Sequence, residues 1–416
     1  MATTDATVTR VDTKRAPLIT TGSAMMFVLL VGTSSFFADM TYEGGRSIVG
    51  PFLQVLGSTA AWIGIAAGAG EFLGYALRFV SGYWADRTGA YWRIAILGYV
   101  VQLFAMPALT FVGFWQLGVA VWFVERIGKA IKNPPRDAML SYATKELGRG
   151  WGYGLHEAMD QFGGFAGPLL MALALGLRAS NGVDQVVDYQ WAFRLLFIPA
   201  VITIGMILFA RSRFPNPHDL ESKTPKAGTA GLGRRFWLYV LAAGFIGAGF
   251  ADFALMAFHF RATSLVSDQW IPVLFAVGIG ADVIAALVAG RLFDRVGFPV
   301  VLVTFGISAI FAPFVFLGTL PLVFVGLVLW GIGLAAQESL MKAALADLIP
   351  KDRRAYGFGA FSLAFGIFWF AGSASMGLLY DRDINLVVAF SLVVSLLALP
   401  VFWVAKSAPL PEGAST

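Results

Sequence analysis

The feature that most constrains this chain is a succession of long apolar segments that fills most of its 416 residues. Mostly apolar segments of about 18 residues or more are typical of helices that cross a membrane. Charged residues make up only 13% of the chain, about half of the roughly 25% found in soluble proteins. The sequence therefore predicts an all-α membrane protein with twelve transmembrane helices, near residues 23–52, 59–81, 92–113, 116–144, 150–176, 190–211, 236–260, 270–291, 298–318, 321–346, 355–379 and 385–406.

Lysine and arginine residues gather between alternate segments, and this asymmetry predicts the orientation of the chain. Basic residues collect in the cytoplasmic loops of membrane proteins. Nineteen of them lie on the side that holds both termini, whereas only Arg178, Arg194, Arg261 and Arg382 lie on the other. Both termini are therefore expected in the cytoplasm, and the protein in a bacterial inner membrane. The same distribution accounts for the net charge of +5 without a nucleic-acid partner.

The stretch SRFPNPHDLESKTPKAGTAGLGRR, rich in Pro, Gly and charge, separates six apolar segments from six more. A stretch of this composition without an apolar period is typical of a linker. The predicted organisation is a cytoplasmic tail at 1–22, a six-helix bundle at 23–211, a cytoplasmic linker at 212–235, a second six-helix bundle at 236–406 and a cytoplasmic tail at 407–416.

Short motifs recur in the same order in the two predicted bundles, which indicates an internal repeat. Two similar six-helix halves are the design of transporters that bind their substrate between the halves, near the middle of the membrane. The paired motifs are FAD at 37–39 and 250–252, DRxG at 86–89 and 294–297, GRGWGYG at 148–154 with RRAYGFG at 353–359, and Gly167 in FAGP with Gly372 in FAGS.

The turn GYWADRTG resembles the signature loop between helices two and three of the major facilitator superfamily. The matching residues are Gly82, Asp86, Arg87 and Gly89, and the arrangement of twelve helices in two halves extends the resemblance over nearly the whole chain. The resemblance implies two pseudo-symmetric six-helix bundles, a small-molecule substrate and a monomer in the lipid bilayer.

The fifth span carries a second resemblance, to the GxxxGP antiporter motif of drug and metabolite exporters in the same family. Gly163, Gly167 and Pro168 in GGFAGP match that motif. The resemblance implies a secondary transporter that exports its solute in exchange for protons.

A gate that opens and closes needs turns that approach a neighbouring helix and charges that pair in only one state. The two DRxG turns supply both, so we expect them to gate the transporter. The alternative is that these charges only fix the topology, as basic loop residues commonly do. The expected gating residues are Gly82, Asp86, Arg87, Gly89, Asp294 and Arg295.

Ionisable residues inside the predicted spans are expensive in a bilayer, at roughly 2.5–3.5 kcal/mol each, and are therefore candidates for function. Asp39 and Glu43 lie one helical turn apart on the first span, so one of them is expected to hold a proton. Arg126 on the fourth span is expected to decide which one, and Asp160 beside the GxxxGP glycines is a further proton carrier. Structural pairing of these charges with one another is the alternative.

Other embedded charges are predicted to line a water-filled substrate cavity, because lipid would exclude them. Two prolines, Pro134 and Pro135, are expected to interrupt and bend the fourth span beside this cavity. The expected substrate-binding residues are Arg46, Glu71, Lys129, Glu157, Asp252 and Glu338.

The embedded charges do not identify the class of substrate. Embedded acids outnumber embedded bases, which favours a cationic or zwitterionic solute. An organic anion is favoured instead by the basic cluster of Arg126, Lys129, Lys132 and Arg136. Proton-coupled uptake of an anion therefore stays beside proton-coupled export as an alternative.

Other classes of function are less compatible with the sequence. The chain contains no cysteine and no GxxxxGK[ST] motif, and HEAMD at 156–160 is only part of a metal-binding HExxH motif. We therefore expect no enzyme activity, no cofactor and no metal site, and an ion gradient as the energy source. A non-transporting membrane sensor remains an alternative, although neither a sensor nor a channel needs two matched halves.

Overall fold

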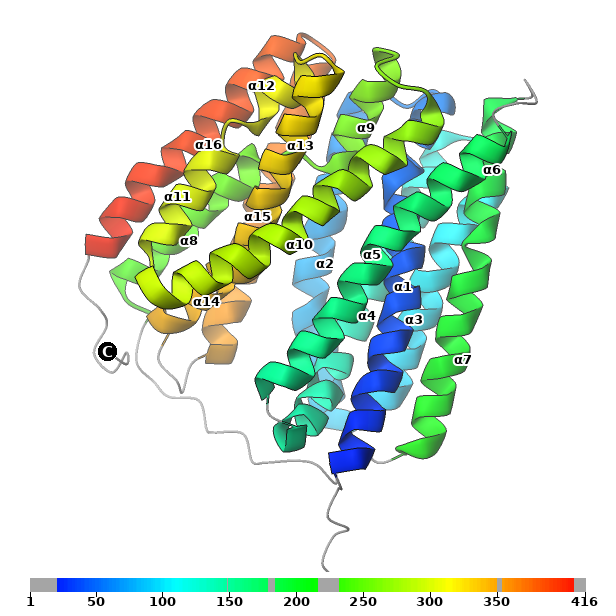
Figure 1. Cartoon of the computed structure of the whole chain (residues 1–416), viewed down its shortest axis with the longest axis vertical. Coiled ribbons are helices and arrows are strands. Elements are labelled where there is room, and N and C mark those ends of the chain that lie inside the picture. Colours follow the sequence, from blue (N-terminus) through cyan, green and yellow to red (C-terminus); the bar gives the residue numbers. More distant parts are fainter. Residues whose placement is uncertain (1–20, 148, 179–183, 216–231, 350–353, 408–416) are drawn as a thin grey trace, which may run out of the picture.

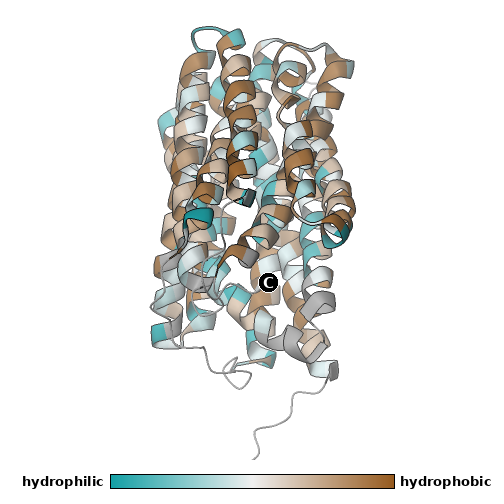
Figure 2. Cartoon of the chain, turned by 90° about the vertical axis from the view of Figure 1, so that its left-hand side faces the viewer, coloured by the Kyte–Doolittle hydropathy of each residue, from teal (hydrophilic) through white to brown (hydrophobic). Residues whose placement is uncertain are grey.

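The computed structural model describes residues 21–147, 149–178, 184–215, 232–349 and 354–407, and this part of the chain contains helices and no strands (Figure 1). A helix satisfies all its backbone hydrogen bonds internally, which is what a chain in lipid requires. Apolar residues cover the sides of the helices, and hydrophilic residues gather toward their ends (Figure 2). Residues 1–20 and 408–416 of the predicted tails and residues 216–231 of the predicted linker lie outside the described residues.

The first half of the chain forms six spans, the last of which consists of two consecutive helices that meet at Leu196. The elements are α1 (Thr21–Val55), α2 (Ala60–Thr88), α3 (Tyr91–Ala108) with the short 3₁₀ helix η1 (Leu109–Phe111), α4 (Trp115–Leu147), α5 (Arg149–Arg178), α6 (Gln185–Leu195) and α7 (Phe197–Arg213).

The second half also forms six spans, three of which contain a break or a change of helix type. The elements are α8 (Arg234–Gly249), α9 (Phe253–Ala262), the 3₁₀ helix η4 (Asp268–Trp270), α10 (Ile271–Val296), α11 (Pro299–Ser308), α12 (Phe311–Phe316), α13 (Leu320–Ala335), the π-helix η5 (Ala336–Leu340), α14 (Met341–Leu348), α15 (Arg354–Tyr380) and α16 (Ile384–Ser407).

These elements confirm the predicted twelve spans in two bundles. Within the described residues, eleven segments are long and apolar enough to cross a membrane. The twelfth, α4, has 33 residues but carries too many charges to meet that criterion. Its charged residues Glu125, Arg126 and Lys132 are buried inside the protein. The expected interruption of this span was wrong, because α4 continues through Pro134 and Pro135 without a break.

The two halves lie side by side, with α1 to α7 in one and α8 to α16 in the other (Figure 1). One end of the molecule, which we call the terminal end, holds Thr21, Arg213, Arg234 and Ser407. The opposite end, where α1 connects to α2, is the far end.

Glycine residues bring equivalent helices together in each half. A side chain at Gly163 would collide with the carbonyl oxygen of Phe36, and one at Gly167 with that of Met40, so α5 contacts the backbone of α1 directly. In the second half, Gly372 of α15 faces the backbone of Ala248 on α8 in the same way. The predicted pairing of Gly167 with Gly372 is therefore visible in the packing.

The contacts between the halves lie at the far end and in the middle of the molecule. At the far end, the Asp381 carboxylate accepts hydrogen bonds from the backbone N–H groups of Ala60 and Ala61, and Arg261 donates one to Gln185. A third contact, between Arg46 and Asp252, joins the halves in the middle of the molecule.

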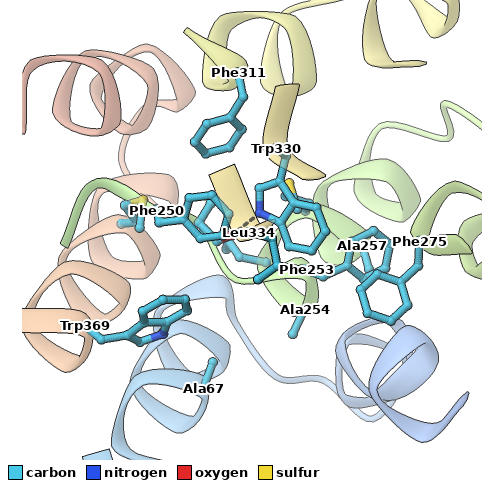
Figure 3. Close-up of a cluster of buried hydrophobic side chains, with 14 of the residues drawn as sticks. Ala67, Phe250, Phe253, Ala254, Ala257, Phe275, Phe311, Trp330, Leu334 and Trp369 are labelled. Atoms are coloured by element: carbon cyan, nitrogen blue, oxygen red, sulfur yellow. Dashed lines mark hydrogen bonds between the residues drawn. The ribbon is translucent and has the colours of Figure 1, made fainter. Parts of the chain in front are cut away.

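The sequence predicts one apolar run at 236–260, but the structure divides it into α8 and α9. The backbone is extended between Gly249 and Phe253, and the Trp330 indole donates a hydrogen bond of 3.0 Å to the Ala251 carbonyl (Figure 3). The ring of Phe250 stacks on Trp330 with the centroids 5.5 Å apart. Aromatic packing and a hydrogen bond from α13 thus stabilise a break that local sequence does not reveal.

Candidate functional site

A charged cavity lies between the halves near the middle of the molecule. Its volume is about 130 Å³, and α1, α4 and α5 from the first half and α10, α13 and η5 from the second half line it. A cavity of about 150 Å³ accommodates a molecule the size of benzene, so this one has room for a small organic group. Its ionisable lining residues are Asp39, Glu43, Arg46, Lys129, Lys132, Arg136, Glu157, Asp160, Asp282 and Glu338.

The cavity brings together seven of the ten residues that the sequence singled out for proton coupling and substrate binding. Arg126, Glu71 and Asp252 do not line it and instead form buried ion pairs beside it. The residues of that prediction that do line the cavity are Asp39, Glu43, Arg46, Lys129, Glu157, Asp160 and Glu338.

Two aspartates from neighbouring helices meet at the cavity wall. The carboxyl groups of Asp39 on α1 and Asp160 on α5 lie close enough to share a hydrogen bond. The ammonium group of Lys132 on α4 acts on both carboxyls and also lies 4.7 Å from the centroid of the Tyr99 ring. The close α1–α5 packing at Gly163 places these two carboxyls side by side.

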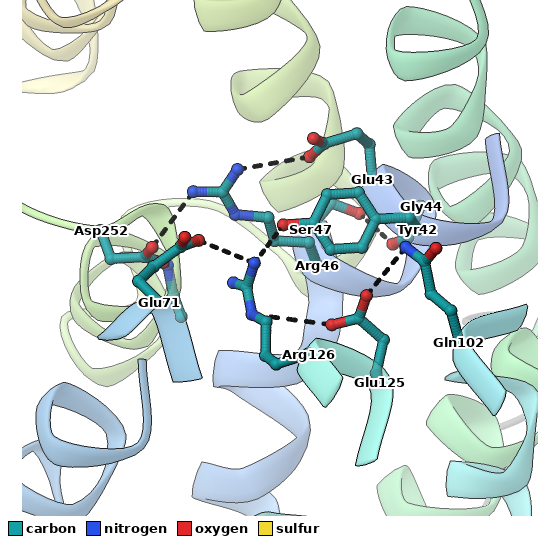
Figure 4. A network of polar contacts seen from close by, with 11 residues as sticks. Tyr42, Glu43, Gly44, Arg46, Ser47, Glu71, Gln102, Glu125, Arg126 and Asp252 are labelled. Carbon is teal, nitrogen blue, oxygen red and sulfur yellow. Dashed lines mark hydrogen bonds and ion pairs between the residues drawn. The ribbon is translucent and has the colours of Figure 1, made fainter. Parts of the chain in front are cut away.

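Arg46 connects the halves at the edge of the cavity. Its guanidinium group lies 3.1 Å from the carboxylate of Asp252 and 3.5 Å from that of Glu43 (Figure 4). Asp252 is 2% exposed, and it also accepts a hydrogen bond of 2.9 Å from the backbone N–H of Ala254 at the start of α9. The break between α8 and α9 therefore positions Asp252 both as a helix cap and as the partner of Arg46.

Arg126 belongs to a network within the first half alone. It lies 2.7 Å from Glu71 and 3.6 Å from Glu125, and it donates a hydrogen bond to the Tyr42 hydroxyl (Figure 4). Gln102 of α3 donates a hydrogen bond of 3.0 Å to Glu125. The structure thus places Arg126 between α1, α2 and α4, where its ion-pair partners are Glu71 and Glu125.

The remaining bases of the cavity also have partners. Lys129 lies 3.7 Å from the centroid of the Tyr42 ring, in cation–π geometry. Arg136 forms an ion pair of 2.8 Å with Asp137. All four basic side chains that line the cavity are therefore engaged by groups of the protein.

The predicted gating residues lie at the terminal ends of α2 and α10, where the structure places all of them except Gly89 inside the helices and not in turns. Gly89 and Gly297 follow α2 and α10 with φ of 65° and 74°, which favours glycine. Arg87, Asp294 and Arg295 are exposed, and within the described residues they form no ion pair. The Asp86 side chain lies outside the described part of the structure, and Gly82 packs loosely against Pro134.

Sequence reasoning missed several polar residues of the site. Tyr42, which contacts both Arg126 and Lys129, lies one residue before Glu43 and carries no charge that would mark it as part of the site. Asn133 and Gln161 line the cavity but carry no charge, so they gave no signal. Asp282 also lines the cavity, although the sequence predicted no role for this acid of the span at 270–291. Among the described residues, no group of three or more His, Asp and Glu side chains is arranged as a metal site.

Two six-helix bundles around a central charged cavity are typical of secondary membrane transporters. The chain belongs to the Major Facilitator Superfamily, whose family model matches residues 27–268 and 256–416. It is therefore a multi-pass membrane protein of a family of secondary transporters, as the sequence predicted.

Relatives extend over nearly the whole chain. An uncharacterized protein of Mycobacterium tuberculosis is 33% identical over 401 residues, which cover 95% of each chain. An uncharacterized MFS-type transporter of Methanocaldococcus jannaschii is 26% identical over 388 residues, covering 89% of this chain and 92% of the relative.

Solved transporter structures share the fold. A bacterial homologue of the iron transporter ferroportin in its inward-facing state has a TM-score of 0.72 at 14% identity, covering 92% of this chain and 99% of the other. An inward-facing bacterial homologue of the human lysosomal transporter Spinster has a TM-score of 0.67 at 14% identity, covering 92% and 95%. At these identities the similarity concerns the fold alone.

Proposed function

We propose that this protein exports a small organic solute across a bacterial inner membrane in exchange for protons, and that the central cavity binds the solute. The observation that carries the proposal is the pair of aspartates, Asp39 and Asp160, on the wall of a cavity that both halves line. A carrier driven by protons needs an acid that can be charged in one state and neutral in another.

The terminal end is the cytoplasmic end in this proposal, because exposed basic residues surround it and basic residues mark the cytoplasmic side. The contacts at the far end then close the outward side, as in an inward-facing state. The cavity forms within one chain, so a monomer is sufficient for transport. The exposed basic residues at this end include Arg87, Arg93, Arg211, Arg213, Arg234, Arg291 and Arg295.

Asp39 and Asp160 form the proposed proton site. Two carboxyls that share a buried site are stabilised when they hold one proton between them, whereas two negative charges repel each other. Lys132 beside the pair can stabilise the form that has released its proton. Glu43 can exchange a proton in a similar way, because its partner Arg46 is shared with Asp252.

In the transport cycle, the halves rock about the cavity. The segments Gly82–Gly89 and Asp294–Gly297 then close the terminal end while the far end opens. The glycines of the GxxxGP motif keep α5 against α1 during this movement, so that Asp39 and Asp160 stay together.

Transport in proteoliposomes tests the proposal. A panel of organic solutes is assayed for uptake and efflux under an imposed pH gradient, with the wild-type chain and with Asp39→Asn. We expect Asp39→Asn to abolish movement driven by the gradient and to leave exchange of solute between the two sides. Asp383→Asn, in an exposed loop at the far end, is the matched control. Coupling at the wild-type level in Asp39→Asn would refute the role of this residue.

Proton-coupled uptake of an organic anion is the second candidate, and the four basic side chains that line the cavity favour it. The same assay separates the two. A solute that enters together with protons, and that moves faster toward the side of higher pH, identifies a symporter.

A further inference from the structure

The charges around the cavity are distributed unequally between the halves. The first half supplies four acids and all four bases, namely Arg46, Lys129, Lys132 and Arg136. The second half supplies only two ionisable groups, Asp282 on α10 and Glu338 on η5, and both are acids. The wall that the second half contributes therefore has an excess of negative charge.

Within the part of the chain that the structure describes, no base forms an ion pair with this wall. Asp282, Glu338 and Glu157 form no ion pair among the described residues, whereas each of the four bases is engaged elsewhere. The charged groups that act most strongly on Asp282 are three further carboxyls, Glu338, Glu157 and Glu43, and its hydrogen-bond partner is Gln161 of the other half. Lys342 on α14 acts on Glu157 from a distance without forming an ion pair.

Burial makes a charged Asp282 unfavourable in the absence of a positive partner, whereas Glu338 and Glu157 are exposed. Asp282 is 2% exposed, and a buried carboxylate without a counter-ion is strongly destabilising. A cation or a proton that enters the site would neutralise this negative charge.

Two independent observations indicate that the missing partner is a ligand. Asn133, which is 9% exposed, lines the cavity, and its Oδ1 has no hydrogen-bond partner among the described residues. A proton on a carboxyl would leave this acceptor unsatisfied, whereas an ammonium group carries several N–H donors. Glu338 lies on the π-helix η5, and single-turn π-helical segments within α-helices occur frequently at functional sites.

We propose that Asp282 and Glu338, together with Glu157, bind the positively charged group of the transported solute, an ammonium or guanidinium group. This inference rests on the proposed transport function and specifies its substrate class. The solute's cationic group lies against the second half, while the bases of the first half face the remainder of the solute. The two walls thus select an organic cation or a zwitterion.

The test uses the purified full-length chain at constant pH and ionic strength. Choline, methylammonium and agmatine serve as probes, and 3,3-dimethylbutan-1-ol serves as the neutral analogue of choline. Binding is measured by isothermal titration calorimetry and by the rise in the midpoint of thermal unfolding. We expect at least one of the cations to bind and the neutral alcohol to have no effect.

Variants locate the binding site. Asp282→Asn and Glu338→Gln should each weaken cation binding by roughly tenfold or more, because each removes one of the carboxylates that would pair with the cation. Asp282→Glu, which retains the charge, should keep binding and shows that the position tolerates substitution. Asp383→Asn should bind as the wild type does.

Two results would overturn the inference: no cation binds to the wild-type chain, or binding survives unchanged in both charge-removing variants. These results are distinct from failure of the proposed function. If cations bind at Asp282 but no solute moves under a pH gradient, proton-coupled export is wrong and the cation site stands. If a pH gradient drives only neutral or anionic solutes, export stands and the cation site is wrong.

Discussion

At the scale of single residues, the ion pair between Arg46 and Asp252 connects the halves through two side chains that are 206 positions apart. Both are buried, at 8% and 2% exposure. Breaking a buried pair leaves one charge without its partner, which is far more destabilising than losing an exposed ion pair.

Asp252→Asn is expected to destabilise the protein by about 3 kcal/mol, because it leaves Arg46 with Glu43 alone while asparagine retains the cap on α9. The midpoint of thermal unfolding in detergent measures the effect. Asp184→Asn is the matched control, since Asp184 caps α6 with the same geometry at an exposed position. A double variant with Arg46→Gln should lose less than the sum of the single changes, and strict additivity would contradict the pairing.

The sequence could predict which residues face the interior but not which of them meet. Asp39, Glu43 and Arg46 share one stripe of α1, and helical periodicity alone is sufficient to show this. The partner of Arg126 depends on how α1, α2 and α4 pack, and the structure places Glu71 and Tyr42 there. The sequence does not show that uncharged residues such as Asn133 line the cavity, because a single amide in a predicted span has no feature that indicates a binding role.

At the scale of elements, the α1–α5 contact depends on two glycines that admit the opposing backbone. Gly167→Ala is expected to lower stability by about 1–3 kcal/mol, because a methyl group would force α5 away from Met40. It should also slow proton-coupled transport, since Asp39 and Asp160 would separate.

Gly205→Ala on α7 is the control for this prediction, because nothing lies within 4 Å of the position where its side chain would begin. Alanine is a better helix former than glycine, so this variant should be neutral or more stable by about 0.5–1 kcal/mol. The thermal midpoints of both variants and their initial transport rates are measured together. Equal midpoints for the two variants would contradict the packing argument.

Length and apolarity were sufficient to predict eleven of the twelve spans, because a helix that crosses a bilayer usually needs both, whereas the charged span α4 does not meet that criterion. They could not predict where the spans change geometry. The break between α8 and α9 depends on Trp330, a residue 79 positions away, and the π-helix η5 depends on how α13 meets α10. At Pro134 and Pro135 the error was the reverse: the sequence predicted a break, but α4 is a continuous helix that contains both residues.

At the scale of the whole molecule, the structure represents one state of a cycle, and the absence of cysteine allows that state to be tested. Paired cysteines at Gln185 and Arg261 should form a cross-link with a short reagent, because these side chains are in contact at the far end.

Cysteines at Ala158 and Leu287 should not cross-link in this state. Each lies seven residues toward the terminal end from the contact between Phe165 and Gly280, and both are exposed. The cross-linked fraction is read from electrophoretic mobility. A bound solute that closes the terminal end should reverse the two results, and efficient cross-linking of both pairs in the same state would contradict alternating access.

The charged helix α4 has a consequence for how the protein is made. Glu125, Arg126, Lys129 and Lys132 lie within one span, and each charge at the centre of a helix opposes insertion by the translocon at roughly 2.5–3.5 kcal/mol. Four such residues exceed what the apolar residues of one segment can offset. We therefore expect α4 to insert only after α1 and α2 have presented Tyr42 and Glu71, which contact Arg126 and Lys129 in the folded chain.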